Sequence, residues 1–339
     1  MTRRLVAAVA VVLAISPAAA LAVSRPAAPR VHPRDTAPVP SYVQKVERAI
    51  LGLKVRARAN ANSSARLGVH RFASAVVIDP RGYAVTVSYA VMDAVEIEAV
   101  RRDGQTVSAT TAGFDLDSGL ALVKLDGKDW VPAPLGQSSD VSPGALTGTV
   151  GVDEDGDLIH VTGSVRSVRR FSASWEYMLE RAFIVAPASA SWGGSALVNE
   201  RGEVIGVGSL RLGQKPTYTN MFIPLERFLP VKDEIIATGR VQSRVPRPWL
   251  GIYTSDDHDG ITVDGFSPIG PAAQAGFKRG DRIVSVNGVD VRSQEEFYET
   301  LWKHRAGEVI KVSVQRDDRV VVIPVQSVDR HRALTTPGR

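Results

Sequence analysis

The most regular hydrophobic pattern in the chain lies shortly after a proline-rich segment near its start. Val43, Val46, Ile50 and Leu53 follow one another at intervals of three, four and three residues. This spacing places the apolar side chains on one face of a helix. It predicts a short amphipathic helix that begins near Ser41 and packs against another element.

Between Phe72 and Phe228 the apolar residues instead form short runs rich in β-branched side chains. Turn-forming residues separate these runs, for example at 79–82 and 200–202. Short strands at such spacing, with few long helical patterns, are typical of an all-β barrel or sandwich. The predicted strands are 75–79, 95–100, 119–125, 161–168 and 203–207.

A second unit is predicted after the proline-rich segment 245–248. Its pattern indicates several strands and one amphipathic helix from Gln294 to Lys303. A closing pair of strands, 309–315 and 320–325, is joined by a turn at Asp317-Asp318. With 339 residues and 44% hydrophobic residues, the chain is long and apolar enough for two domains.

The first residues have the pattern of an export signal. Arg3 and Arg4 precede the uncharged apolar segment Leu5–Val23, and the small-x-small triplet at its end allows cleavage after Ala22. The segment also approaches the length that spans a bilayer, so an uncleaved anchor is the alternative. Either way we expect an exported protein, secreted or located in the cell envelope and there anchored by residues 5–23.

Composition excludes several kinds of chemistry. The chain has no cysteine, and its six histidines are scattered without short pairing, so we expect no disulfide, no thiolate nucleophile, no metal site and no cofactor. The net charge of +5 is local, because residues 25–71 hold ten Lys or Arg and two acidic residues. This arm either contacts an anionic membrane surface or is simply solvated. We expect no nucleic-acid binding.

Three segments of the second unit, 249–252, 267–277 and 278–288, resemble the bacterial PDZ domain. Upstream, four further segments follow the order found in HtrA/Deg-type serine proteases. These are Gly82–Thr86, Gly119–Lys124, Gly202–Gly206 and Phe222–Pro224.

The resemblance covers residues 42–327 and implies a mainly β protein, in which a trypsin-like double β-barrel precedes an α+β PDZ domain. It also suggests a homo-oligomer, a trimer. The expected organisation is a signal peptide or anchor (1–23), a Pro/Arg-rich linker (24–40), a protease-fold domain (41–240), a hinge (241–248), the PDZ domain (249–328) and a tail (329–339).

The resemblance fails at the catalytic triad. A serine peptidase needs a serine hydroxyl, a histidine that takes its proton and a carboxylate that orients the imidazole. The family's histidine position falls on Tyr89, whose phenol, with a pKa of about 10, is an inefficient base at neutral pH. The aspartate position falls on Gly119. Asp115 and Asp117 lie nearby, but the displacement along the chain changes their reach.

The family's nucleophile segment corresponds to residues 190–197. Counting back from its last leucine puts Gly193 at the serine position, whereas matching the Gly-Gly pair puts Trp192 there. Neither is a nucleophile. Ser191 and Ser195 are the remaining candidates if the turn has another register, and otherwise they are ordinary turn hydroxyls. Trp192 either fills the substrate cleft or is a core or loop aromatic.

The PDZ segment keeps the residues that its function requires. PDZ domains bind a peptide as an added strand beside an exposed edge, through main-chain hydrogen bonds and a side-chain pocket. By resemblance, Trp249-Leu250-Gly251-Ile252 is the carboxylate-binding loop, and Phe297, Leu301 and Tyr298 line the pocket. The alternative is that these residues only pack the domain. The implied ligand is an extended polypeptide or a protein C-terminus with an apolar last residue.

The sequence therefore favours an exported, non-catalytic polypeptide-binding or scaffold protein, a pseudoprotease with a PDZ domain that acts in envelope protein quality control or signalling. Two alternatives stay open. One is an active HtrA-like serine endopeptidase with a displaced triad. The other is an oligomeric structural or assembly platform, in which the helix from Ser41 mediates oligomerisation.

Overall fold

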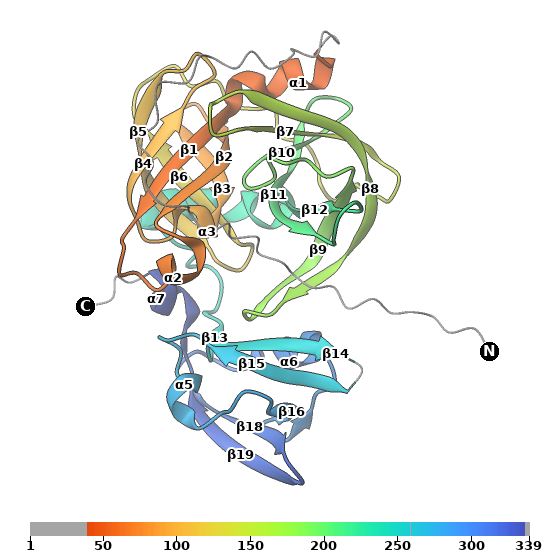
Figure 1. The fold of residues 1–339 in the computed structure, drawn as a ribbon. Helices are drawn as coiled ribbons and strands as arrows, with labels where there is room; N and C mark the ends of the chain where they lie inside the picture. Colours follow the sequence, from red (N-terminus) through yellow and green to blue (C-terminus); the bar gives the residue numbers. More distant parts are fainter. Residues whose placement is uncertain (1–38, 258, 336–339) are drawn as a thin grey trace, which may run out of the picture.

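The computed structural model describes residues 39–257 and 259–335. It contains two closed six-stranded antiparallel barrels and a C-terminal α+β domain (Figure 1). The mainly β class, the trypsin-like double barrel and the PDZ domain that the sequence predicted are all confirmed. The predicted export signal and most of the Pro/Arg-rich linker lie outside the described residues. Within the described ranges, no helix is long and apolar enough to span a bilayer.

The first barrel has the strand order β1-β2-β3-β6-β5-β4. Short helices α2 (Ser64–Leu67) and α3 (Ser88–Val91) occupy its connections. Its strands are β1 (Ile50–Ala57), β2 (His70–Asp79), β3 (Tyr83–Val87), β4 (Ala94–Val100), β5 (Thr106–Asp115) and β6 (Leu120–Leu125).

The second barrel has the order β10-β11-β12-β9-β8-β7. Two single-turn helices, η2 (Leu225–Arg227) and η3 (Leu229–Val231), and helix α4 (Lys232–Thr238) follow it. Its strands are β7 (Leu146–Val152), β8 (Leu158–Ala173), β9 (Tyr177–Ala186), β10 (Ala196–Asn199), β11 (Val204–Leu212) and β12 (Thr219–Pro224).

The C-terminal domain is a sheet in the order β14-β15-β16-β18-β19, with β17 paired to β16 and β14 at the edge. A separate pair, β13 with β20, connects the start and end of the domain. Its elements are β13 (Pro248–Trp249), β14 (Ile252–Asp257), β15 (Gly260–Phe266), α5 (Ala272–Ala275), β16 (Arg282–Val286), β17 (Val289–Asp290), α6 (Gln294–Leu301), β18 (Val309–Arg316), β19 (Arg319–Gln326), β20 (Val328–Asp329) and α7 (Arg330–Thr335).

The period of two along β18 shows why this sheet forms. Ile310, Val312 and Val314 are buried in the domain's apolar core, while the alternating residues Val309 and Lys311 are exposed. Alternation of this kind gives an antiparallel sheet one face toward a core and one face toward water. Helix α6 covers the inner face with Phe297 and Leu301.

The amphipathic helix predicted from Ser41 is shorter than expected. Helix α1 covers Ser41–Val46, a 3-10 turn covers Glu47–Ala49, and β1 starts at Ile50. Val43 and Val46 are buried from the helix, whereas Ile50 and Leu53 are buried from the strand. The prediction of a longer helix was wrong because β1 pairs with both β2 and β4, and this tertiary pairing outweighs a weak helical period.

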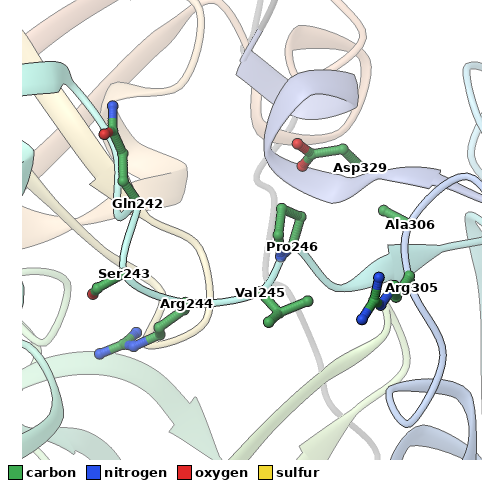
Figure 2. A pocket seen from close by; sticks show the side chains of 8 residues that line it. All are labelled: Gln242, Ser243, Arg244, Val245, Pro246, Arg305, Ala306 and Asp329. Atoms are coloured by element: carbon green, nitrogen blue, oxygen red, sulfur yellow. The ribbon is translucent and has the colours of Figure 1, made fainter.

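Ion pairs fix the segment that links the two parts of the chain. Both carboxylate oxygens of Asp115 accept hydrogen bonds of 3.0 Å from Arg244. Arg247 lies 3.4 Å from an oxygen of Asp117, and its guanidinium stacks on the Trp302 ring. Figure 2 shows the linker lining an open depression. Its walls are Gln242, Ser243, Arg244, Val245 and Pro246 on the linker side, with Arg305, Ala306 and Asp329 opposite.

Candidate functional site

The turn that corresponds to the nucleophile segment is held between the two barrels by its backbone. The carbonyl oxygen of Gly193 accepts a hydrogen bond from the Ser74 N–H on β2 (2.7 Å), and the Gly194 N–H donates to the Gly208 carbonyl on β11 (2.8 Å). Gly194 has φ +76°, and a Cβ there would collide with the Ser74 carbonyl. The position therefore requires glycine.

Two of the positions that the sequence aligned with the triad, 89 and 193, lie close together in this structure. A Cβ added to Gly193 would lie 3.2 Å from the Tyr89 hydroxyl, which donates a hydrogen bond of 2.7 Å to the Ser209 carbonyl. Of the two registers that the sequence allowed, the geometry thus places Gly193 beside Tyr89. Burial raises the pKa of the Tyr89 phenol above its ordinary range, so at neutral pH it stays protonated.

The third of these positions, Gly119, is close to Tyr89 along the backbone, and a side chain from β9 fills the space beside it. The Gly119 carbonyl accepts a hydrogen bond from the Ser88 N–H, one residue before Tyr89. A Cβ on Gly119 would lie 2.8 Å from the hydroxyl of Tyr177, which donates to the Ser118 carbonyl. Tyr177 therefore occupies the space that a carboxylate side chain at position 119 would need.

The two nearby carboxylates, Asp115 and Asp117, form ion pairs with arginine side chains. Asp115 is buried and binds Arg244, and it also accepts hydrogen bonds from the N–H groups of residues 117 and 118. Asp117 lies within 3.4 Å of Arg247 and 3.7 Å of Arg227. Neither carboxylate takes the place of the missing one beside Tyr89.

The fallback serines make local hydrogen bonds. Ser191 donates to the Val152 carbonyl at 2.6 Å, and Ser195, fully buried, donates to the Trp192 carbonyl at 2.9 Å. In the part of the chain that the structure describes, neither serine hydrogen bonds to a histidine. A serine hydroxyl without an adjacent base is a poor nucleophile.

Trp192 is half-buried and lies against the second barrel. Its ring lies 4.6 Å from the guanidinium of Arg211, and the same guanidinium lies 4.5 Å from the Tyr218 ring. A cation between two aromatic faces is held in one position. The indole is thus part of a fixed wall beside the former nucleophile turn.

The segment that the sequence predicts as the carboxylate-binding loop, 249–252, contacts a carboxylate of the chain itself. Leu250 and Ile252 are fully buried, and their N–H groups donate to the two carboxylate oxygens of Glu176 at 3.0 and 2.8 Å. Gly251 between them has φ +77°, and a Cβ there would lie 2.6 Å from the Cα of Gly270. Trp249 is also buried, and it pairs with Val328 across β13 and β20.

Glu176 belongs to the hairpin between β8 and β9, whose tip lies along the PDZ domain. The Ser174 carbonyl accepts a hydrogen bond from the Thr254 N–H on β14 (3.0 Å). The Tyr298 hydroxyl on α6 donates to the Ala173 carbonyl (2.7 Å) and accepts from the Glu176 N–H (3.2 Å). Sequence reasoning missed both Glu176 and Tyr177, because no local pattern relates them to segments many tens of residues away.

The environment of Glu176 raises the pKa of its carboxyl group. Burial raises its pKa from 4.5 to about 7, while hydrogen bonds from the Leu250 and Ile252 N–H groups and the charge of Arg330 act in the opposite direction. Its other titratable neighbour is the Tyr298 phenol, whose own pKa burial raises. No group of three or more His, Asp or Glu residues within 39–257 and 259–335 is placed to hold a metal ion.

Introducing a carboxylate at position 119 is expected to destabilise the protein. Gly119→Asp forces a side chain into a left-handed backbone (φ +81°) and against Tyr177. Gly104→Asp is the matched control, because Gly104 has φ +79° but open space around it. Urea unfolding should show a loss of about 1 kcal/mol for the control and about 2 kcal/mol more for Gly119→Asp. Equal losses would contradict the placement of Tyr177.

The raised pKa of Glu176 predicts a pH-dependent stability. The folded state binds more protons than the unfolded state between pH 4.5 and about 7, so the contribution of Glu176 is fully present below pH 4.5 and is lost as the pH rises through 7. Urea unfolding of the wild type and Glu176→Gln at pH 5 and pH 8 should show the wild type losing up to about 3 kcal/mol relative to the variant. If the wild type instead became more stable relative to the variant between pH 5 and pH 8, the raised pKa of Glu176 would be refuted.

Comparison with known proteins agrees with this architecture. The family model of the trypsin-like peptidase domain matches residues 73–207, and that of the PDZ domain matches residues 248–326. The serine endoprotease DegS of Escherichia coli K12 is 28% identical over 286 residues, which cover 78% of this chain and 79% of DegS. The serine protease Do-like HtrA of Lactobacillus helveticus is 25% identical over 275 residues, covering 73% of this chain and 65% of that protein.

Solved structures share the fold. The HtrA-type protease AlgW with a decapeptide superposes with a TM-score of 0.55 at 22% identity, covering 85% of this chain and 98% of AlgW. The serine endoprotease from Yersinia pestis gives a TM-score of 0.53 at 24% identity, covering 85% and 96%. The chain is therefore a homologue of the DegS/HtrA serine endoproteases, built from a trypsin-like peptidase domain followed by a PDZ domain.

Proposed function

We propose that this protein is an exported, non-catalytic member of the DegS/HtrA group that binds extended or C-terminal peptides through its PDZ domain. One observation carries the proposal. Three positions correspond to the triad of a protease with this fold. Here they hold the phenol of Tyr89 and two glycines, Gly193 and Gly119, which contribute only backbone, and the Tyr177 side chain fills the space beside Gly119. None of these groups can take a proton from a nucleophile at neutral pH.

The backbone of the site is kept although its catalytic side chains are absent. The turn at Gly193 and Gly194 is still clamped to β2 and β11 by main-chain hydrogen bonds. A protease fold without a nucleophile and a base supplies shape and support but no acyl transfer. This supports a binding or scaffold role. The relatives named serine endoproteases share the domain order, and their activity is a property of those proteins.

The PDZ domain supplies the chemistry for a peptide ligand. The N–H groups of Leu250 and Ile252 face a carboxylate, and edge strand β14 offers main-chain groups for strand addition. AlgW was solved with a decapeptide, which supports peptide binding by this fold. A peptide-binding site of this kind fits a role in protein quality control or signalling in the cell envelope. Residues 1–23 would direct the chain to the envelope.

The platform alternative has less support. The apolar face of α1 packs against the chain's own second barrel, where the Tyr42 hydroxyl lies 2.5 Å from Thr162 Oγ1 and Lys45 donates to the Arg201 carbonyl. Val43 and Val46 are fully buried there. The helix therefore does not offer a free apolar face for oligomerisation, and a trimer would have to form through other surfaces.

The basic segment is only partly available for a membrane. Arg58 pairs with Asp93, and Arg71 donates to the carbonyls of Tyr89 and Met92. The proposed contact with anionic lipid therefore rests on the exposed basic residues of the segment, such as Arg48 and Lys54, and on those between 25 and 34, which lie outside the described residues.

A fluorophosphonate probe and fluorescent casein test the loss of catalysis. The full-length protein, purified in mild detergent, should show neither labelling nor turnover, with trypsin as the positive control. Labelling that disappears in Ser191→Ala or Ser195→Ala would show that a triad has been rebuilt, and would overturn the non-catalytic assignment.

A further inference from the structure

We infer that the tip of the β8–β9 hairpin is an internal ligand of the PDZ groove, in which the Glu176 side chain takes the place of a peptide's C-terminal carboxylate. An external peptide then binds only after the hairpin has left. The inference rests on the proposed peptide-binding function and specifies how that binding is controlled. Figure 1 shows this hairpin extending from the second barrel to the edge of the PDZ domain.

The carboxylate contact is the first argument. The Glu176 oxygens accept hydrogen bonds from Leu250 and Ile252, on either side of a glycine in the left-handed conformation. Consecutive backbone N–H groups in such a turn form a concave anion site. Glu176 is completely buried there. A peptide C-terminus needs these same donors, so both carboxylates cannot be bound together.

The strand contact is the second argument. Ile252 contacts Glu176, and Thr254, two residues further along β14, contacts Ser174, two residues earlier in the hairpin. The two contacts run in antiparallel order, and one of them, from the Thr254 N–H to the Ser174 carbonyl, is a main-chain hydrogen bond of the kind that strand addition uses. Since β14 lies at the end of its sheet, the hairpin occupies the edge that strand addition requires.

The apolar pocket is also engaged. Met178 of β9 is buried and belongs to the apolar core of the PDZ domain together with Phe297 and Leu301, the residues predicted to line the pocket. Methionine is flexible and fills irregular apolar spaces. The carboxylate site, the strand edge and the apolar surface of the groove are therefore all covered by one segment, 173–178.

The backbone of the turn supports a specific role for Glu176. The three residues between β8 and β9 are Ser174, Trp175 and Glu176, and Glu176 has φ +54°. Three-residue hairpin loops favour glycine at the left-handed position. A glutamate at this position is explained by the contact its side chain makes, not by the needs of the turn.

Competition between the hairpin and an external peptide tests the inference. The probe is a fluorescein-labelled peptide with the sequence of Arg169–Trp175 followed by a C-terminal methionine, prepared with a free carboxylate and as the amide. Fluorescence anisotropy is measured on the full-length protein in detergent, as wild type, Glu176→Gln, Glu176→Asp and the control Glu200→Gln. Glu200 is exposed in a turn of the same barrel. Amide exchange of residues 249–254 is measured on the same samples.

We expect both Glu176 variants to bind the free-carboxylate peptide at least tenfold more tightly than the wild type, because apparent affinity falls with the fraction of open groove. Glutamine replaces one of the two accepting oxygens by an NH2 group, which cannot accept from a backbone N–H, and aspartate keeps both oxygens on a side chain one methylene shorter. The Glu200→Gln protein should match the wild type, the amidated peptide should bind to none of them, and amide exchange at 249–254 should be faster in both Glu176 variants.

The outcomes separate this inference from the proposed function. Equal peptide affinities and unchanged exchange in wild type and Glu176 variants would overturn the internal ligand and leave peptide binding intact. The other informative outcome is faster amide exchange in the Glu176 variants together with no binding of the free-carboxylate peptide to any of the proteins. It would support docking of the hairpin on the PDZ domain, but it would overturn the proposed peptide-binding function and therefore also the competition between hairpin and peptide.

Discussion

A buried carboxylate lies at the centre of the contact between the two parts of this protein. Glu176 leaves water completely and is compensated by the N–H groups of Leu250 and Ile252 and by the charge of Arg330. Burial of an ionised group is costly unless hydrogen bonds replace its hydration. Burial nevertheless raises the pKa of Glu176 above its ordinary value, so the hydrogen bonds and the charge of Arg330 offset the cost of burial only in part.

The same hairpin connects the PDZ domain with the region of Gly119 in the first barrel. Glu176 and Tyr177 are neighbours in sequence, yet one side chain enters the carboxylate-binding loop and the other fills the space beside Gly119. Successive side chains at the start of a strand point to opposite sides. One short segment therefore contacts both the PDZ domain and the surroundings of Gly119 in the first barrel.

The framework of the barrel domain depends on backbone pairing and on apolar burial. The barrels are held by strand pairing and by apolar cores, and the nucleophile turn is fixed by the backbone groups of Ser74, Gly193 and Gly208. Side chains that perform catalysis contribute little to this framework. Tyr89 and Tyr177 instead satisfy nearby carbonyl groups and close the space that a triad would use.

The sequence by itself determined the two-domain organisation, many of the strands and helix α6, because these depend on local periodicity and on short motifs such as Trp249-Leu250-Gly251-Ile252. Only the tertiary structure decided that Ile50 starts a strand, that Gly193 lies opposite Tyr89, and that Glu176 occupies the PDZ loop. These features arise from pairings between segments distant in the chain, whose partners leave no local pattern in the sequence.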